Sequence, residues 1–288
     1  MPLPQVRRVW PRRIQSIEEV PQAFRPYFDS FGGEFPYVIF DPAERAFSTR
    51  VHAKLICILE SEVRIYEKEK SQVKEICIKI EDVNDVEYGT ILLYSWITVY
   101  LSGSRAGIRL VFNSTAEPLY KPVLDRLRSV SAQGETEDAG PETEKERDKF
   151  DFMITQNHKF MNFGRKSIEP GEEIRQILFQ PEMKTPYLKL FGKTFYKSFL
   201  KTSLVVLTGR ELILIKEPEN TRTDIAGVKQ YFSLKKIKHL RVENPADLEK
   251  CILEIVFHDE TRLFVELEQS RYEEAKSMTE TLPVQTGV

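Results

Sequence analysis

The chain has 288 residues, of which 41% are hydrophobic, and its formal net charge is -2. The length fits two domains of about 100–150 residues, and the composition is that of a globular protein. A near-neutral chain is not expected to bind nucleic acid through its overall charge. Three cysteines, Cys57, Cys77 and Cys251, are too few for a disulfide framework, so we expect three buried, reduced thiols.

The first 14 residues form a basic tail that contains Arg7, Arg8, Arg12 and Arg13. The tail lacks the apolar segment of a secretory signal. The longest apolar stretch, residues 91–101, is too short for a membrane-spanning helix, which needs about 20 residues. We therefore expect a cytoplasmic protein with no transmembrane segment.

The first half reads as a helix, a set of short strands and a second helix. Residues 15–32 predict a helix that Pro21 and Pro26 interrupt. Short apolar and β-branched runs then predict strands. They cover residues 38–40, 55–59, 63–66, 76–86, 91–101 and 108–112. Apolar residues at helical spacing predict a helix over 120–130. The first predicted domain is thus 15–130.

Residues 131–149 are rich in acids and carry no large apolar side chain, which predicts a linker whose end begins a helix near Pro141. The second predicted domain, 150–282, starts with a helix over 150–163. Ser270 and Glu273 predict the capped start of a closing helix, and 283–288 form a tail. Predicted strands lie between these helices, at 174–179, 204–207, 212–215, 231–242, 251–257 and 263–267.

The two halves repeat one plan. Gly33-Glu34 followed by 38–42 matches Gly171-Glu172 followed by 177–181. Two apolar runs around a turn with a glutamate follow in each half, at 55–65 and 204–214. Two weakly similar copies indicate a tandem architecture in place of one large fold.

This order resembles the pleckstrin-homology-like superfamily, in particular its bacterial members. The second copy carries the matching motifs: Gly171-Glu172, then the segment 207–212 (LTGREL), then 234–240 (LKKIKHL). The first copy departs, because residues 59–63 (LESEV) replace the Leu-Thr turn. The resemblance implies an α+β, mostly β fold: two antiparallel barrels or sandwiches, each with flanking helices and a C-terminal capping helix. It implies no catalytic residue, and such folds bind lipids, peptides or proteins.

No motif for catalysis, metal or nucleotide binding stands out. The four histidines are far apart in sequence, and none has the spacing of a metal site. We expect no catalytic residue, no metal and no cofactor. An enzyme of unknown class ranks third among the functions considered.

One segment, 184–201, is basic and aromatic, and no acidic residue occurs from Met183 to Arg210. On a helical wheel its lysines lie opposite its phenylalanines, as in a helix that lies in a membrane interface. The predicted anion- or membrane-binding residues are Lys184, Lys189, Lys193, Lys197, Lys201, Phe191, Phe195 and Phe199. In pleckstrin-homology folds, the loop after the first strand often binds phosphorylated headgroups, and this segment follows the first strand of the second copy.

Two alternatives remain for this segment. The same residues can alternate as a strand, with aromatic side chains in a core and lysines in water, or they can form a partner or oligomer interface. A second basic set, Lys235, Lys236, Lys238 and Arg241, stands where the first copy is acidic, and it is a candidate face for an acidic partner.

We therefore expect a non-enzymatic cytoplasmic binding or scaffold protein with peripheral attachment at the membrane. Its second domain would contact an anionic lipid surface or an acidic protein. The alternative is a protein–protein adaptor or homo-oligomer that uses 184–201 as its interface. Nucleic acid is not expected as a partner.

Overall fold

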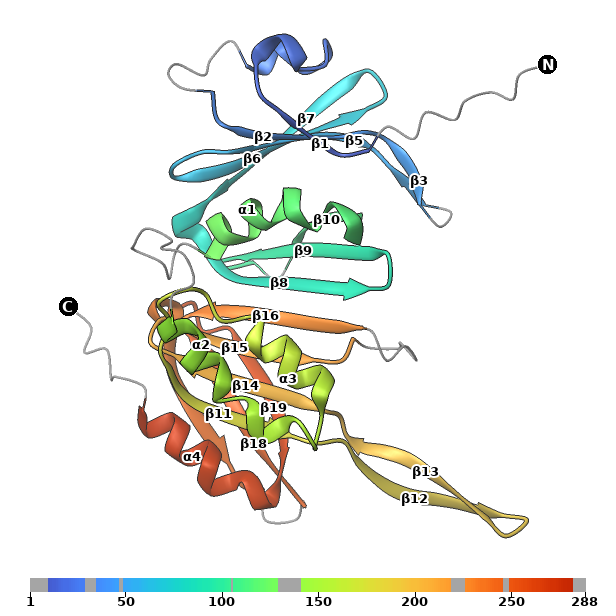
Figure 1. Cartoon of the computed structure of the whole chain (residues 1–288), viewed down its shortest axis with the longest axis vertical. Helices are drawn as coiled ribbons and strands as arrows, with labels where there is room; N and C mark the ends of the chain where they lie inside the picture. Colours follow the sequence, from blue (N-terminus) through green and yellow to red (C-terminus); the bar gives the residue numbers. More distant parts are fainter. Residues whose placement is uncertain are drawn as a thin grey trace. The chain divides into compact units, whose positions relative to one another are not determined.

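The computed structural model describes residues 10–28, 35–46, 49–104, 106–128, 141–218, 226–245 and 249–281. These residues form two compact units: 1–83 with 115–130, and 84–114 with 131–288. The fold is mostly β, with antiparallel sheets and a helix near the C-terminus, as expected for the α+β class (Figure 1). No sheet closes on itself within the described residues.

The first unit is built on a five-stranded sheet in the order β1-β2-β5-β6-β7. Its strands are β1 (Arg12–Ile14), β2 (Tyr37–Asp41), β5 (Ala53–Ile58), β6 (Glu62–Glu69) and β7 (Gln72–Lys79). A short hairpin of β3 (Glu44–Ala46) and β4 (Thr49–Val51) stands between β2 and β5 in the sequence. The unit ends with helix α1 (Glu117–Arg128).

One face of this sheet packs on the N-terminal segment. Val38, Leu55 and Tyr66 from the strands are buried against Val20 and Phe24. The predicted helix over 15–32 is wrong. The described part holds two 3-10 turns, η1 (Ile17–Glu19) and η2 (Arg25–Tyr27), because the prolines prevent a continuous hydrogen-bonded helix. Residues 12–14 of the predicted basic tail are a strand.

The second unit contains a seven-stranded sheet in the order β10-β9-β8-β16-β15-β14-β11. Three strands come from the first half of the chain: β8 (Val83–Ile91), β9 (Tyr94–Leu101) and β10 (Ile108–Asn113). The other four are β11 (Ile174–Gln180), β14 (Ser203–Thr208), β15 (Glu211–Lys216) and β16 (Gly227–Ser233). β8 and β16 pair side by side, with Val86 opposite Tyr231.

A three-stranded sheet completes the core of this unit. Its strands are β17 (Ile237–Glu243), β18 (Lys250–Phe257) and β19 (Arg262–Glu268), and helix α4 (Tyr272–Thr281) packs on it with Ala275 and Met278 buried. Leu212, Phe232 and Leu253 belong to the same buried cluster. The closing helix is therefore present, but it begins at Tyr272, and its predicted cap Ser270 lies in the 3-10 turn η7 (Gln269–Arg271).

Two further helices precede β11. α2 (Pro141–Asp148) confirms the predicted helical end of the linker. α3 (His158–Arg165) follows the 3-10 turn η5 (Asp151–Met153), so only the last part of the predicted helix over 150–163 is α-helical. Asn157 caps α3, because its side chain accepts a hydrogen bond from the backbone N–H of Phe160.

Two of the long predicted strands, 76–86 and 231–242, are each interrupted by a 3-10 turn. η3 (Ile80–Asp82) separates β7 from β8, and η6 (Leu234–Lys236) separates β16 from β17. The expectation of three buried thiols is wrong for one residue. Cys57 and Cys251 are buried, whereas Cys77 on β7 is exposed. In the part of the chain that the structure describes, no helix is both long and apolar enough to cross a membrane.

Candidate functional site

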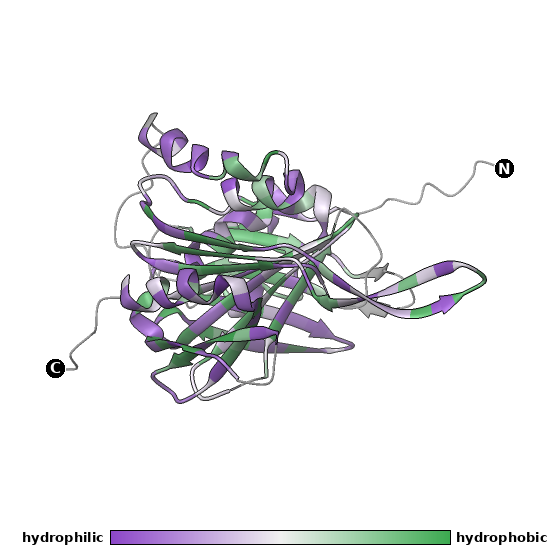
Figure 2. Ribbon diagram, turned by 90° about the horizontal axis from the view of Figure 1, so that it is seen from below, coloured by the Kyte–Doolittle hydropathy of each residue, from purple (hydrophilic) through white to green (hydrophobic). Residues whose placement is uncertain are grey.

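The basic, aromatic segment forms a long β-hairpin of β12 (Met183–Leu190) and β13 (Lys193–Leu200). In the views of Figures 1 and 2 it extends away from the other strands of its unit. The hairpin is its own two-stranded sheet, so neither strand pairs with another part of the described chain. We call this feature the arm.

The sequence explains why the arm is a hairpin. Phe191 and Gly192 are the only residues between the two strands, and both have positive φ, 50° and 75°. Two-residue turns with positive φ at both positions match the twist of the flanking strands, and glycine adopts such angles at little cost. Pro186 has no N–H to donate, and it is tolerated because each strand of the arm is an edge.

The predicted helical arrangement is wrong, and so is the separation of the two side-chain types. Successive residues of a strand point to opposite faces, so residues two apart share a face. Lys193, Phe195, Lys197 and Phe199 therefore lie on one face of β13. The alternative of a strand is right about the secondary structure, but it placed the aromatic side chains in a core, and Tyr187, Phe191 and Phe195 are exposed.

The arm exposes apolar side chains along its length. Phe191 at the tip is 95% exposed, Tyr187 is 62% exposed and Tyr196 is 59% exposed. Phe195 lies directly opposite Leu188, and both are more than two-fifths exposed. Figure 2 shows hydrophobic and hydrophilic residues mixed along the ribbon of the arm. Exposed apolar groups gathered on one element indicate a contact surface.

At its base the arm joins the core of the unit. Leu200 is buried with 1% of its surface exposed, Phe199 is half-buried, and β13 contacts β19. Lys184 forms an ion pair of 2.9 Å with Glu182, and this hydrogen bond raises the pKa of Lys184. Lys189, Lys193, Lys197 and Lys201 are exposed. Of the predicted set, Phe199 is thus the least available for binding.

Sequence analysis left four exposed apolar residues of the arm out of the predicted site: Tyr187, Leu188, Leu190 and Tyr196. Leu190 and Tyr196 were missed because a helical wheel, with a period of 3.6 residues, separates them from the phenylalanines, whereas side chains alternate with a period of 2 in the strands of the arm. A glycine after an apolar run, with alternating residues on both sides, was the available signal for a hairpin.

The second predicted basic set lies on η6 and β17. Lys235, Lys238 and Arg241 are exposed, and Lys236 is partly exposed. Lys238 forms an ion pair with Glu260, which offsets part of the positive charge. His239 lies between these residues. Burial lowers the pKa of His239, and the positive charges of Arg241 and Lys238 lower it further. This set has no exposed aromatic residue within it, in contrast to the arm.

Comparisons with models of protein families and with curated proteins found no match to this chain.

Proposed function

We propose that the chain is a non-enzymatic binding protein whose arm docks on an anionic membrane surface at the cytoplasmic side. The observation that carries this proposal is the tip: Phe191 is almost fully exposed, and lysines without acidic neighbours surround it. An apolar tip can enter the headgroup region, while lysines near the surface add about 1 kcal/mol each.

We further propose that the chain contains two pleckstrin-homology-like domains, 15–130 and 150–282. The order of elements supports this. Each half contains four strands that pair in sequence as one antiparallel ladder, β2-β5-β6-β7 or β11-β14-β15-β16. A 3-10 turn follows, then three more strands, a second 3-10 turn and a helix. A hairpin also follows the first strand of the ladder in each half: β3-β4 after β2, and β12-β13 after β11. The long arm is thus an enlarged version of an element present in both halves.

The buried contacts of the second half add support. Glu172 of the Gly-Glu pair accepts a hydrogen bond from Thr208 of the Leu-Thr turn, at 3.1 Å. Two of the three motifs that carried the resemblance therefore meet in one buried interaction. Glu34 of the first copy lies outside the described residues, so the matching contact is not compared.

Vesicle co-sedimentation tests the docking proposal. The purified chain is mixed with neutral vesicles or with vesicles that contain phosphatidylserine, at low and at physiological salt. We expect binding only to the anionic vesicles and weaker binding at higher salt, because salt screens exposed charges. Phe191→Ser should reduce binding, and the quadruple change of Lys189, Lys193, Lys197 and Lys201 to Gln should abolish it.

Matched controls separate the arm from general charge. Changing Lys68, Lys70, Lys74 and Lys79 to Gln removes the same charge from exposed positions on β6, β7 and their turn. Phe152→Ser removes an exposed aromatic from η5. Both controls should bind as the unchanged protein does. No binding by the unchanged protein, or equal loss in the controls, would overturn the proposal.

The arm also supports a second candidate function, a protein–protein adaptor or homo-oligomer. Leu188 and Phe195 form an exposed apolar pair on the arm, which would suit a protein surface. Sedimentation velocity of the unchanged protein and of Phe191→Ser, at low and high salt, distinguishes the two functions. A dimer that persists at high salt and dissociates in the variant supports the adaptor.

A further inference from the structure

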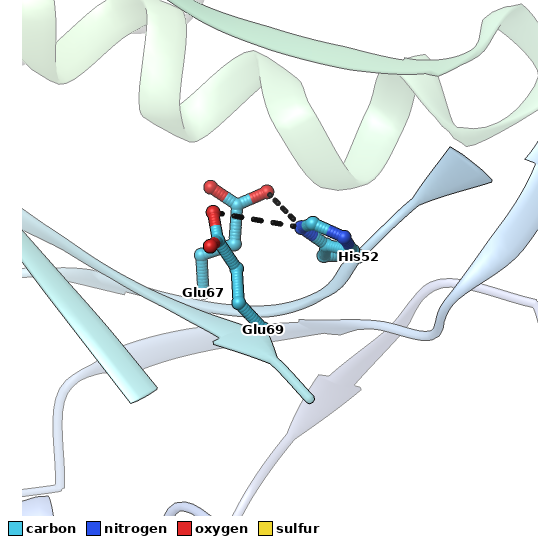
Figure 3. Close-up of side chains that lie close together, drawn as sticks. All are labelled: His52, Glu67 and Glu69. Carbon is cyan, nitrogen blue, oxygen red and sulfur yellow. Dashed lines mark ion pairs between the residues drawn. The ribbon is translucent and has the colours of Figure 1, made fainter. Parts of the chain in front are cut away.

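Three potential metal ligands lie together in the first unit: His52, Glu67 and Glu69 (Figure 3). Nδ1 of His52 is 3.6 Å from Oε1 of Glu67 and 3.8 Å from Oε1 of Glu69. One ligand atom from each residue lies within 4.8 Å of the other two. The three side chains converge from two neighbouring segments of the sheet.

The sheet register explains the convergence. Glu67 and Glu69 are two residues apart on β6, so they point to the same face. Ala53 at the start of β5 pairs with Lys68 of β6, which places the preceding residue, His52, across from Glu69. Side chains directly opposite on antiparallel strands have Cβ atoms about 5 Å apart. The backbone therefore fixes the positions of all three ligands.

Charged residues on the neighbouring strands β5 and β2 lie beside the cluster, and one of them pairs with Glu67. Lys54 is buried, and its Nζ lies 3.7 Å from Oε1 of Glu67. Asp41 stands opposite Lys54 on β2 and accepts a hydrogen bond of 2.7 Å from the hydroxyl of Tyr120. The buried ammonium thus has a carboxylate on each neighbouring strand. Such surrounding contacts orient metal-ligating carboxylates in proteins.

The donor set decides which ion fits. One imidazole nitrogen and two carboxylate oxygens suit a divalent transition ion better than Ca²⁺, which takes oxygen ligands alone. Ligands at about 2.1 Å from a tetrahedral zinc ion lie about 3.4 Å apart, close to the spacings from His52 to the two carboxylates. The exposed fractions of the side chains are 34% for His52, 20% for Glu67 and 55% for Glu69, so an ion can reach them and keep a water molecule.

We propose that His52, Glu67 and Glu69 bind a divalent transition ion, with Zn²⁺ as the best fit, through three protein ligands and one open position. The ion would link the segment that follows β4 to the end of β6. It would replace the repulsion between two neighbouring carboxylates with attraction to a shared cation. Sequence analysis expected no metal because the ligands are distant in sequence, and only the strand pairing brings them together.

Isothermal titration of the full, metal-stripped chain with Zn²⁺ tests the site. We expect one ion per chain, and an affinity at least about tenfold weaker in His52→Ala and in Glu69→Gln. Zn²⁺ should also raise the melting temperature of the unchanged protein, because it binds only the folded state, and should not raise that of the variants. Glu67→Gln is avoided because it would remove one of the two carboxylates that neighbour the buried Lys54.

Two control variants test whether the ion binds elsewhere. His258→Ala removes an exposed histidine, and Glu75→Gln removes an exposed carboxylate from the neighbouring strand β7. Both should keep the affinity of the unchanged protein. No saturable binding of one ion, or binding that survives His52→Ala or Glu69→Gln, would show that the cluster is a set of cross-strand ion pairs only.

Discussion

The hydroxyl of Thr208 donates a hydrogen bond of 3.1 Å to the carboxylate of Glu172, and both residues are buried. The other carboxylate oxygen accepts the backbone N–H of Glu169 at 2.9 Å. The backbone N–H groups of Arg210 and Glu211 in turn donate to the Thr208 hydroxyl. One threonine thus ties the loop before β11 to the turn between β14 and β15.

Thr208→Val should lower the free energy of unfolding by about 1–3 kcal/mol. Valine keeps the shape but leaves a buried carboxylate and two backbone donors with fewer partners. Urea denaturation measures the change. Thr208→Ser restores a hydroxyl and should recover most of the loss. A valine variant as stable as the unchanged protein would show that the contact contributes little to folding.

Asp85 on β8 is a buried carboxyl group with 9% of its surface exposed. Burial, aided by the negative charge of Glu87 and by that of Asp259, raises the pKa of Asp85 to about 7, while Lys216 opposes the shift. The ordinary value is 3.8. The folded protein therefore holds this proton more tightly than the unfolded chain does.

The sign of the pH dependence follows from this shift. Below about pH 4, Asp85 is protonated in both the folded and the unfolded protein. As the pH rises toward 7, the unfolded chain loses this proton first, which favours the unfolded state. The contribution of Asp85 to stability should thus fall between about pH 4 and pH 7. Asp85→Asn should remove that fall and make the protein more stable than the unchanged chain at pH 8. Parallel pH profiles of the two melting temperatures would contradict the prediction.

Cys77 should be the reactive thiol among the three cysteines, because Cys57 and Cys251 are buried. Its Sγ donates a hydrogen bond of 3.0 Å to Glu62, and burial together with this carboxylate raises the pKa of Cys77. Burial raises the pKa of Cys57 to about 12. A thiol reagent should therefore modify one cysteine of the native protein at pH 8, and slowly.

Glu62→Gln should speed up that reaction, because the neutral amide no longer disfavours the thiolate. The rate with a chromogenic disulfide measures the effect, and Cys77→Ser should abolish the reaction of the native protein. Glu69→Gln, which changes another carboxylate of β6, is the control. An unchanged rate in Glu62→Gln would mean that access to the sulfur, and not its pKa, controls the reaction.

The predictable part of this fold is the part that local patterns determine. The strands around 55–66 and 204–215 follow from short apolar runs on either side of a turn, and a closing helix was predicted close to where α4 lies. The pairing of Val86 with Tyr231 could not be predicted, because it joins strands from different halves of the chain. Hydrophobic patterns identify a strand but not its distant neighbour.

The candidate sites illustrate the same limit. The composition of 184–201 correctly singled out an exposed element, but lysines and phenylalanines spaced by four fit both a helix and a strand. Only the turn at Phe191-Gly192 distinguishes them, through its positive φ angles. His52 and Glu67 are separated in sequence by most of two strands, so no motif search could pair them. The pairing of β5 with β6 places them together, and no short motif encodes that pairing.

Gly192→Ala distinguishes a hairpin from a helix in the arm. A Cβ at Gly192 would meet no atom within 4 Å, so the substitution acts through the backbone alone. Alanine at a φ of 75° costs about 1–2 kcal/mol in the hairpin, whereas it would favour a helix by about 1 kcal/mol. The variant should therefore weaken binding to anionic vesicles and speed chymotrypsin cleavage at the aromatic residues of the arm.

Gly192→Asn provides the matched control, because asparagine tolerates the left-handed region better than alanine does. It should bind vesicles and resist cleavage nearly as well as the unchanged protein. Stronger binding by the alanine variant than by the asparagine variant would mean that the arm becomes helical on the membrane. In that case binding would depend on the amphipathic composition of 184–201 and not on the rigid tip that Phe191 and Gly192 form in the free protein.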